Sequence, residues 1–161
     1  MNESNVLLSI AEVAVALLGF AAIVSVFRQR DTWRPDGRFW AMVGAGAGTL
    51  IFSLLPLPFL FGSIAAISTW QTCCTLLGFY ALGYCGLLIS SFRRDQAAGA
   101  APNPPIFVGI FVGSALSSLF LFSSAIGWLD GPHFWSYLVG LIWFQVVTVI
   151  IFIRLLVVWL R

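Results

Sequence analysis

Five long runs of apolar residues, separated by short polar segments, dominate the hydrophobic pattern of the chain. The runs cover residues 6–27, 39–61, 70–92, 106–128 and 134–153. Each can cross a hydrocarbon core about 30 Å thick, which requires roughly 20 residues of helix. The pattern therefore predicts an all-α, polytopic transmembrane helical bundle of five spans, with residues 1–161 forming a single transmembrane domain.

Two prolines interrupt the second run, at Pro56 and Pro58. Each proline removes a backbone donor, so we expect the helix to kink or end near Leu55. Residues 56–68 fit a loop, a helix extension or a re-entrant segment, and the sequence leaves these three alternatives open.

The composition supports the membrane interpretation, because 60% of the residues are hydrophobic and only 9% are charged. An ordinary soluble domain carries about 25% charged residues to cover its surface. Nucleic-acid binding would require a basic face on a folded surface. Here the basic residues flank apolar runs instead, so we expect the lipid bilayer as a partner and no nucleic acid.

The basic residues also predict the topology. All eight are arginine, and most lie in two clusters, residues 28–38 and Arg93–Arg94. Cytoplasmic loops carry the excess of Lys and Arg, so an even number of spans must separate the two clusters. Five spans with the N-terminus outside and the C-terminus cytoplasmic satisfy this rule, whereas four do not. We expect an integral protein of a membrane, the bacterial cytoplasmic (inner) membrane.

Glu12 is the one acidic residue inside a predicted span, close to its outer boundary. Ionisable residues within a membrane are candidates for function, here a proton or cation site. Ala16 and Gly19 follow at helical spacing and suit close contact with another helix. We therefore expect Glu12 to point into a bundle rather than at lipid. An interhelical hydrogen bond, or a hydrated position near the surface, would also account for it.

Three further polar residues complete the candidate ion site. Gln71 and Tyr137 are expected at a depth similar to that of Glu12, and Gln145 near the middle of the membrane. Buried amides in membranes usually bridge helices, so a structural role is favoured for Gln145.

Small residues recur at helical spacing and predict close packing of helices. They indicate self-association only weakly, because such spacings are common. The residues assigned to helix packing are Gly19, Gly44, Gly48, Gly109, Gly113 and Ser117.

Chemistry-bearing groups are sparse. The single histidine, His133, is expected in an exposed turn, and the three cysteines lie in one apolar run without metal-ligand spacing. We therefore predict no catalytic residues, no metal site, no cofactor and no enzymatic activity. The leading hypothesis is a pore or transporter subunit for a small ion or solute, acting as a homo-oligomer. The alternative is an accessory or assembly protein that binds the transmembrane helices of another membrane protein.

Overall fold

The computed structural model describes residues 3–28, 37–61, 66–97, 104–128 and 133–159. Within these residues the secondary structure is helical, without strands. The helices are α1 (Glu3–Arg28), α2 (Gly37–Leu54), α3 (Leu57–Phe61), α4 (Ala66–Ala97), α5 (Pro104–Ala125) and α6 (His133–Trp159).

Five stretches of the described chain are long and apolar enough to cross a membrane, which confirms the predicted helical class and the number of candidate spans. They are Glu3–Ile23, Phe39–Phe59, Thr69–Arg94, Pro105–Ala125 and His133–Val157. The second stretch joins α2 to the beginning of α3. Polar residues at the helix ends explain why the helices run past the apolar segments: α4 includes Arg93 and Arg94, and α1 begins at Glu3, an acid favoured in a first turn.

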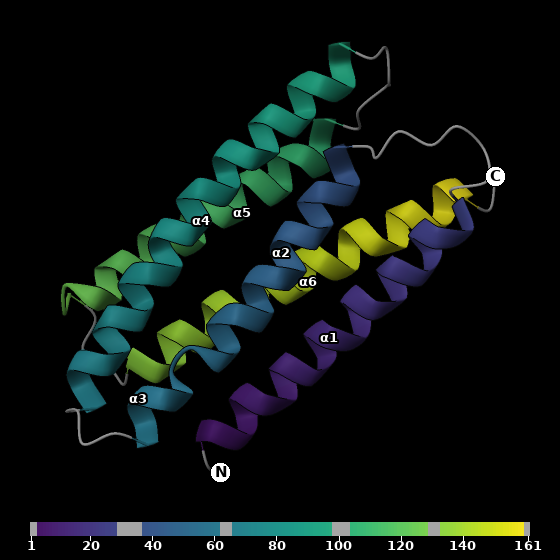
Figure 1. The fold of residues 1–161 in the computed structure, drawn as a ribbon. Helices are drawn as coiled ribbons and strands as arrows, with labels where there is room; N and C mark the ends of the chain where they lie inside the picture. The colour runs from purple at the N-terminus through teal and green to yellow at the C-terminus, as the bar shows by residue number, and fades with distance from the viewer. Residues whose placement is uncertain (1–2, 29–36, 62–65, 98–103, 129–132, 160–161) are drawn as a thin grey trace.

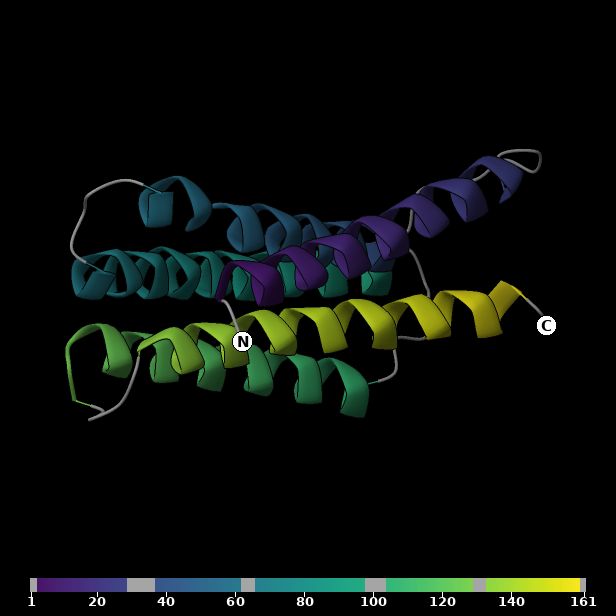
Figure 2. The ribbon, with the colours of Figure 1, turned by 90° about the horizontal axis from the view of Figure 1, so that it is seen from below.

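The long helices run side by side along one axis, with the N-terminus and C-terminus at opposite ends (Figure 1). Helix α4 packs most closely on α5, and α2 lies between α4, α6 and α1. Helix α1 contacts mainly α2 and, to a smaller extent, α6. Figure 2 shows α1 lying obliquely across the bundle, and most residues of its apolar stretch Glu3–Ile23 are not buried.

Proline ends α2 where the sequence predicts, and the structure shows how the break is stabilised. Helix α2 ends at Leu54, and the short α3 begins at Leu57. Because Pro56 has no N–H, the carbonyl of Phe52 loses its usual helical donor. The Tyr137 hydroxyl of α6 donates a hydrogen bond to this carbonyl instead. The break is thereby fixed to the helix that packs beside it.

Helix α5 ends three residues earlier than the apolar run. Gly127 takes a left-handed conformation (φ 81°), and the Trp128 N–H donates to the Ser123 carbonyl at 3.0 Å. This pattern is a Schellman cap, in which glycine avoids the steric cost of positive φ. His133 is the first residue of α6, half-buried, with Nδ1 3.1 Å from the Ser124 hydroxyl. The exposed position expected for His133 is therefore wrong.

Aromatic rings fill the space between α2, α4 and α6. The Phe144 ring lies 5.5 Å from that of Tyr80 and 5.4 Å from that of Tyr84. Nearer the start of α4, the Trp70 ring lies 5.7 Å from that of Tyr137. Tyr137 and Phe144 are fully buried. The centre of the single chain is thus closely packed with large side chains.

Candidate functional site

Helix α1 has one covered face and one open face. Leu7, Ala11, Ala14 and Ala21 are buried. Small side chains on this face let α1 approach α2, where Gly46 leaves room for Leu18. The open face carries five exposed residues at helical spacing, which we call the α1 stripe: Asn5, Ser9, Glu12, Ala16 and Gly19.

Glu12 lies on the open face, so the expectation that it points into the bundle is not met within a single chain. The reason is that Ala11 and Ala14 occupy the face against α2, and Glu12 faces away from them. None of the described residues forms a hydrogen bond or an ion pair with its carboxylate. Glu12 is nine residues beyond the start of α1, about 14 Å along the helix axis.

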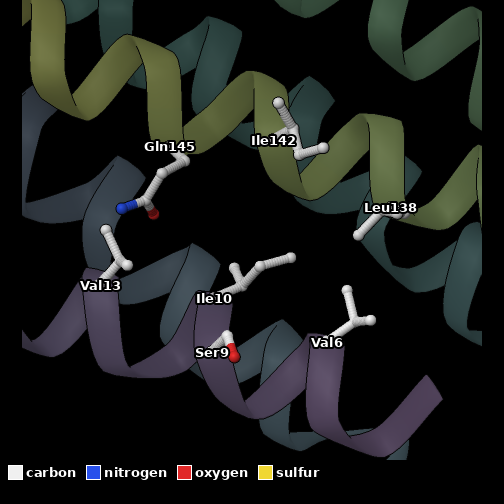
Figure 3. Close-up of a pocket in the computed structure, with 7 residues that line it drawn as sticks. All are labelled: Val6, Ser9, Ile10, Val13, Leu138, Ile142 and Gln145. Atoms are coloured by element: carbon white, nitrogen blue, oxygen red, sulfur yellow. The ribbon is translucent and has the colours of Figure 1, made fainter. Parts of the chain in front are cut away.

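A pocket of about 350 Å³ opens beside this face, between α1 and α6 (Figure 3). Its walls are almost entirely aliphatic. The lining residues are Val6, Ser9, Ile10 and Val13 of α1 and Leu138, Ile142 and Gln145 of α6. Ser9 belongs to both the pocket and the α1 stripe, so the two features adjoin along α1.

Gln145 supplies the polar group at one end of this pocket. Figure 3 shows its amide beside Val13. Its Nε2 and Oε1 atoms are both buried, and neither has a hydrogen-bond partner. A buried amide without partners costs free energy, so such groups in folded proteins call for an explanation. Gln145 also lies at the level of Val13, one residue from Glu12.

The other two members of the predicted ion site are placed elsewhere. Tyr137 is completely buried between helices, where its hydroxyl is committed to the Phe52 carbonyl. It therefore does not line a site with Glu12. Gln71 is half-buried on α4, a helix that packs against α2, α5 and α6. The structure brings Gln145, rather than Gln71 or Tyr137, to the level of Glu12.

The glycines assigned to packing fall into two groups. Inside the chain, a Cβ at Gly48 would overlap the Tyr80 ring, and a Cβ at Gly113 would overlap the Trp143 ring. Gly44 lies beside Tyr84, with 3.6 Å between that ring and an ideal Cβ. By contrast, Gly19 and Gly109 are exposed, with open space where a side chain would extend.

Ser117, the last of the assigned packing residues, is half-buried, and its hydroxyl has no hydrogen-bond partner. The neighbouring Ser118 is engaged in the chain itself, where its hydroxyl donates to the Gly78 carbonyl of α4 at 3.1 Å. Ser118 therefore links α5 to α4.

Metal chemistry has no evident donor set among the described residues, where no three His, Cys, Asp or Glu side chains gather. Cys73, Cys74 and Cys85 are free and buried in the packed centre. The Cys74 thiol donates to the His133 carbonyl at 3.6 Å. Among the predicted site residues, Glu12, which is exposed, and Gln145, whose amide has no partner, are thus the ones that a ligand or a partner could contact.

Sequence reasoning identified Glu12 and Gln145 but not the pocket that adjoins them. Ser9 and the aliphatic residues around it carry no motif, and only the packing of α1 beside α6 brings them together. Comparison with known protein families, with curated proteins and with solved structures finds no match for this chain.

Proposed function

We propose that this protein is a non-enzymatic accessory subunit of a membrane assembly, and that its α1 stripe packs against a transmembrane helix of another protein. The observation that supports this proposal is the exposed carboxylate of Glu12, near the middle of the stretch Glu3–Ile23, which is long and apolar enough to span a membrane. A charged side chain facing hydrocarbon at this depth costs several kcal/mol, about 3 on insertion scales. A neighbouring helix that covers Glu12 removes this cost.

The orientation belongs to the same proposal: five spans, N-terminus outside and C-terminus cytoplasmic. Exposed tryptophans at the ends of the helices, such as Trp40 and Trp128, suit the membrane interface. Arg93 and Arg94, both exposed near the end of α4, suit the cytoplasmic side.

Cysteine labelling tests the orientation. A cysteine in place of Trp128, which is 85% exposed, should react with a membrane-impermeant maleimide in intact cells. A cysteine in place of the exposed Gln96 should react only after permeabilisation. The native cysteines are buried and provide a low background. Labelling in the reverse order would contradict the proposed orientation.

The shape of the α1 stripe suits a helix as its partner. Ala16 and Gly19 follow Glu12 at helical spacing, and both are exposed. Small residues allow two helix backbones to approach closely, and close approach is how membrane helices gain packing energy. A neighbouring helix would therefore both shield the carboxylate and fill the space above Gly19.

The charges of the chain favour a different protein over a second copy. The nearest arginine on α1 is Arg28, sixteen residues from Glu12 and about 24 Å away along the helix. All other basic residues also lie at the ends of the apolar runs. A second copy of this chain thus brings no cation to the level of Glu12. The partner helix we propose carries a Lys or an Arg at that level.

Site-specific photo-crosslinking in the native membrane tests the proposal. A photoreactive residue at Ala16 should link to one defined membrane protein, whereas one at the exposed Leu119 of α5 should not. Gly19→Leu should reduce the Ala16 crosslink at least about tenfold, because the branched side chain blocks close approach. Gly109→Leu is the matched control, since Gly109 is equally open on α5, and it should leave the crosslink unchanged.

Two variants of Glu12 distinguish the effect of its polar group from the effect of its size. Glu12→Leu should weaken the same crosslink more than Glu12→Gln, which keeps hydrogen-bonding capacity. Crosslinking of Ala16 to lipid alone would overturn the proposal.

The pore hypothesis remains a second candidate, favoured by the common level of Glu12 and Gln145 midway along the bundle. Because Tyr137 and Phe144 fill the centre of the chain, a solute path would have to run between copies. Crosslinks from Ala16 only to other copies of this chain would support this alternative over the accessory role. Proton flux in liposomes that Glu12→Gln reduces would then be expected.

A further inference from the structure

The pocket between α1 and α6 combines three features. It has a volume of about 350 Å³ and is open on one side, it is lined almost entirely by aliphatic side chains, and it ends at a carboxamide without partners. Ligand pockets in proteins have volumes of about 300–1,000 Å³ and apolar walls with a few polar groups that fix orientation. The α1–α6 pocket matches this description at the lower end of the volume range.

The Gln145 amide specifies the polar group of a suitable ligand. Its Nε2 donates and its Oε1 accepts, and both atoms are buried without a partner. A hydroxyl satisfies both at once, because its oxygen accepts from Nε2 and its proton is donated to Oε1. A ketone or an ether would leave Oε1 unpaired.

The walls specify the rest of the ligand. Val6 and Ile10 of α1 face Leu138 and Ile142 of α6 across the pocket, and Val13 lies beside the Gln145 amide (Figure 3). A water molecule in this pocket would find few hydrogen-bond partners, whereas a buried water molecule usually makes two to four hydrogen bonds. A slender aliphatic chain fills the same space and gains van der Waals contact with these apolar walls.

We infer that the α1–α6 pocket binds a lipid-soluble alcohol, a single aliphatic or isoprenoid chain whose hydroxyl is held by the Gln145 amide. The site differs from the α1 stripe, which turns Glu12 away from the pocket and toward a partner helix. A variant that abolishes alcohol binding in the pocket should therefore still bind the partner helix at the α1 stripe, and the two proposals can fail separately.

Photolabelling of the full chain in lipid nanodiscs tests this site. The probe is a C16 fatty alcohol carrying a diazirine, and the matched control probe is the corresponding alkane without the hydroxyl. The alcohol should label peptides that contain residues 6–13 and 138–145 roughly tenfold more than the alkane does, because only the alcohol can form hydrogen bonds with both atoms of the Gln145 amide.

Three variants distinguish specific binding from partition into lipid. Gln145→Leu should lower alcohol labelling to the level of the alkane, and Ile10→Trp should abolish labelling by both probes because the indole fills the pocket. Gln71→Leu removes an amide from α4 and should change neither. Equal labelling by alcohol and alkane in the unmodified chain would overturn the proposal.

Thermal stability provides a second test, because its response to a change at Gln145 shows whether this residue has a structural role. Because the amide has no partner within the described chain, Gln145→Leu should leave the thermal stability of the empty protein unchanged or raise it. A fall in stability would show that Gln145 bridges helices instead. A further result would also overturn the proposal. If neither probe labels the pocket peptides and these peptides crosslink to another chain, the pocket is an interface between helices.

Discussion

Gly113→Leu is expected to lower the free energy of unfolding by about 3 kcal/mol or more, the largest loss among the exposed or half-buried glycines. Even the first carbon of a side chain at this position would overlap the Trp143 ring. The ring is held in place by a hydrogen bond from Nε1 to the Ser114 hydroxyl, at 3.1 Å. Trp143 would have to leave this position, and α5 would separate from α6. Thermal or SDS-induced unfolding in mild detergent measures the loss.

Gly109→Leu is the matched control, one turn earlier on the same helix. Gly109 is exposed with open space around it, so the change should alter stability by no more than about 0.5 kcal/mol. Gly113→Ala with Trp143→Phe should recover part of the stability that Gly113→Ala alone removes, because the smaller ring leaves room for the methyl group. Equal losses at Gly109 and Gly113 would show that the contact with Trp143 is not the cause.

Tyr137→Phe is expected to cost about 1–3 kcal/mol of stability, although it removes a single oxygen atom. The hydroxyl donates to the Phe52 carbonyl, which Pro56 deprives of its helical donor. Tyr84→Phe is the comparison, because the Tyr84 hydroxyl donates to the Ala41 carbonyl at 3.0 Å inside the regular part of α2. The Ala41 carbonyl has a second donor along the helix, so Tyr84→Phe should cost less stability than Tyr137→Phe, about 0.5–1.5 kcal/mol.

A double-mutant cycle tests the explanation directly. In a Pro56→Ala background, the backbone N–H returns and can donate to the Phe52 carbonyl, so Tyr137→Phe should cost markedly less there. Unfolding of the four proteins in the same detergent gives the coupling between the two positions. An equal cost of Tyr137→Phe in both backgrounds would refute the link between the proline and the tyrosine.

The candidate site was only partly predictable. Glu12 and Gln145 stand out because ionisable and amide groups are rare in apolar runs, which is a property of the residues themselves. Their neighbours could not be assigned in the same way. Tyr137 was placed beside Glu12 from its expected depth alone, but its hydroxyl is buried against Phe52. Gln145 lies nearer the level of Glu12 because α1 is offset along α6, so that residues 6–13 of α1 lie beside residues 138–145 of α6.

The glycines show the same limit. The spacing of Gly109 and Gly113 indicates that one face of α5 carries small side chains. Because both residues belong to the same motif, the spacing does not show which of them contacts another helix. Only the position of Trp143 on α6 makes Gly113 essential for packing and leaves Gly109 free. A spacing identifies a helix face that permits close approach, and the neighbouring helix decides which residue is used.

The sequence by itself determined the helical class, the five candidate spans and the break before Pro56. Each of these follows from local properties: the length of an apolar run, or the missing N–H of proline. Only the tertiary structure decided which way Glu12 faces and where the pocket opens. Apolar residues lie on all sides of α1, so its sequence specifies no preferred buried face. The rotation of α1 was therefore set by the fit of Ala11 and Ala14 against α2, and that fit turned Glu12 outward.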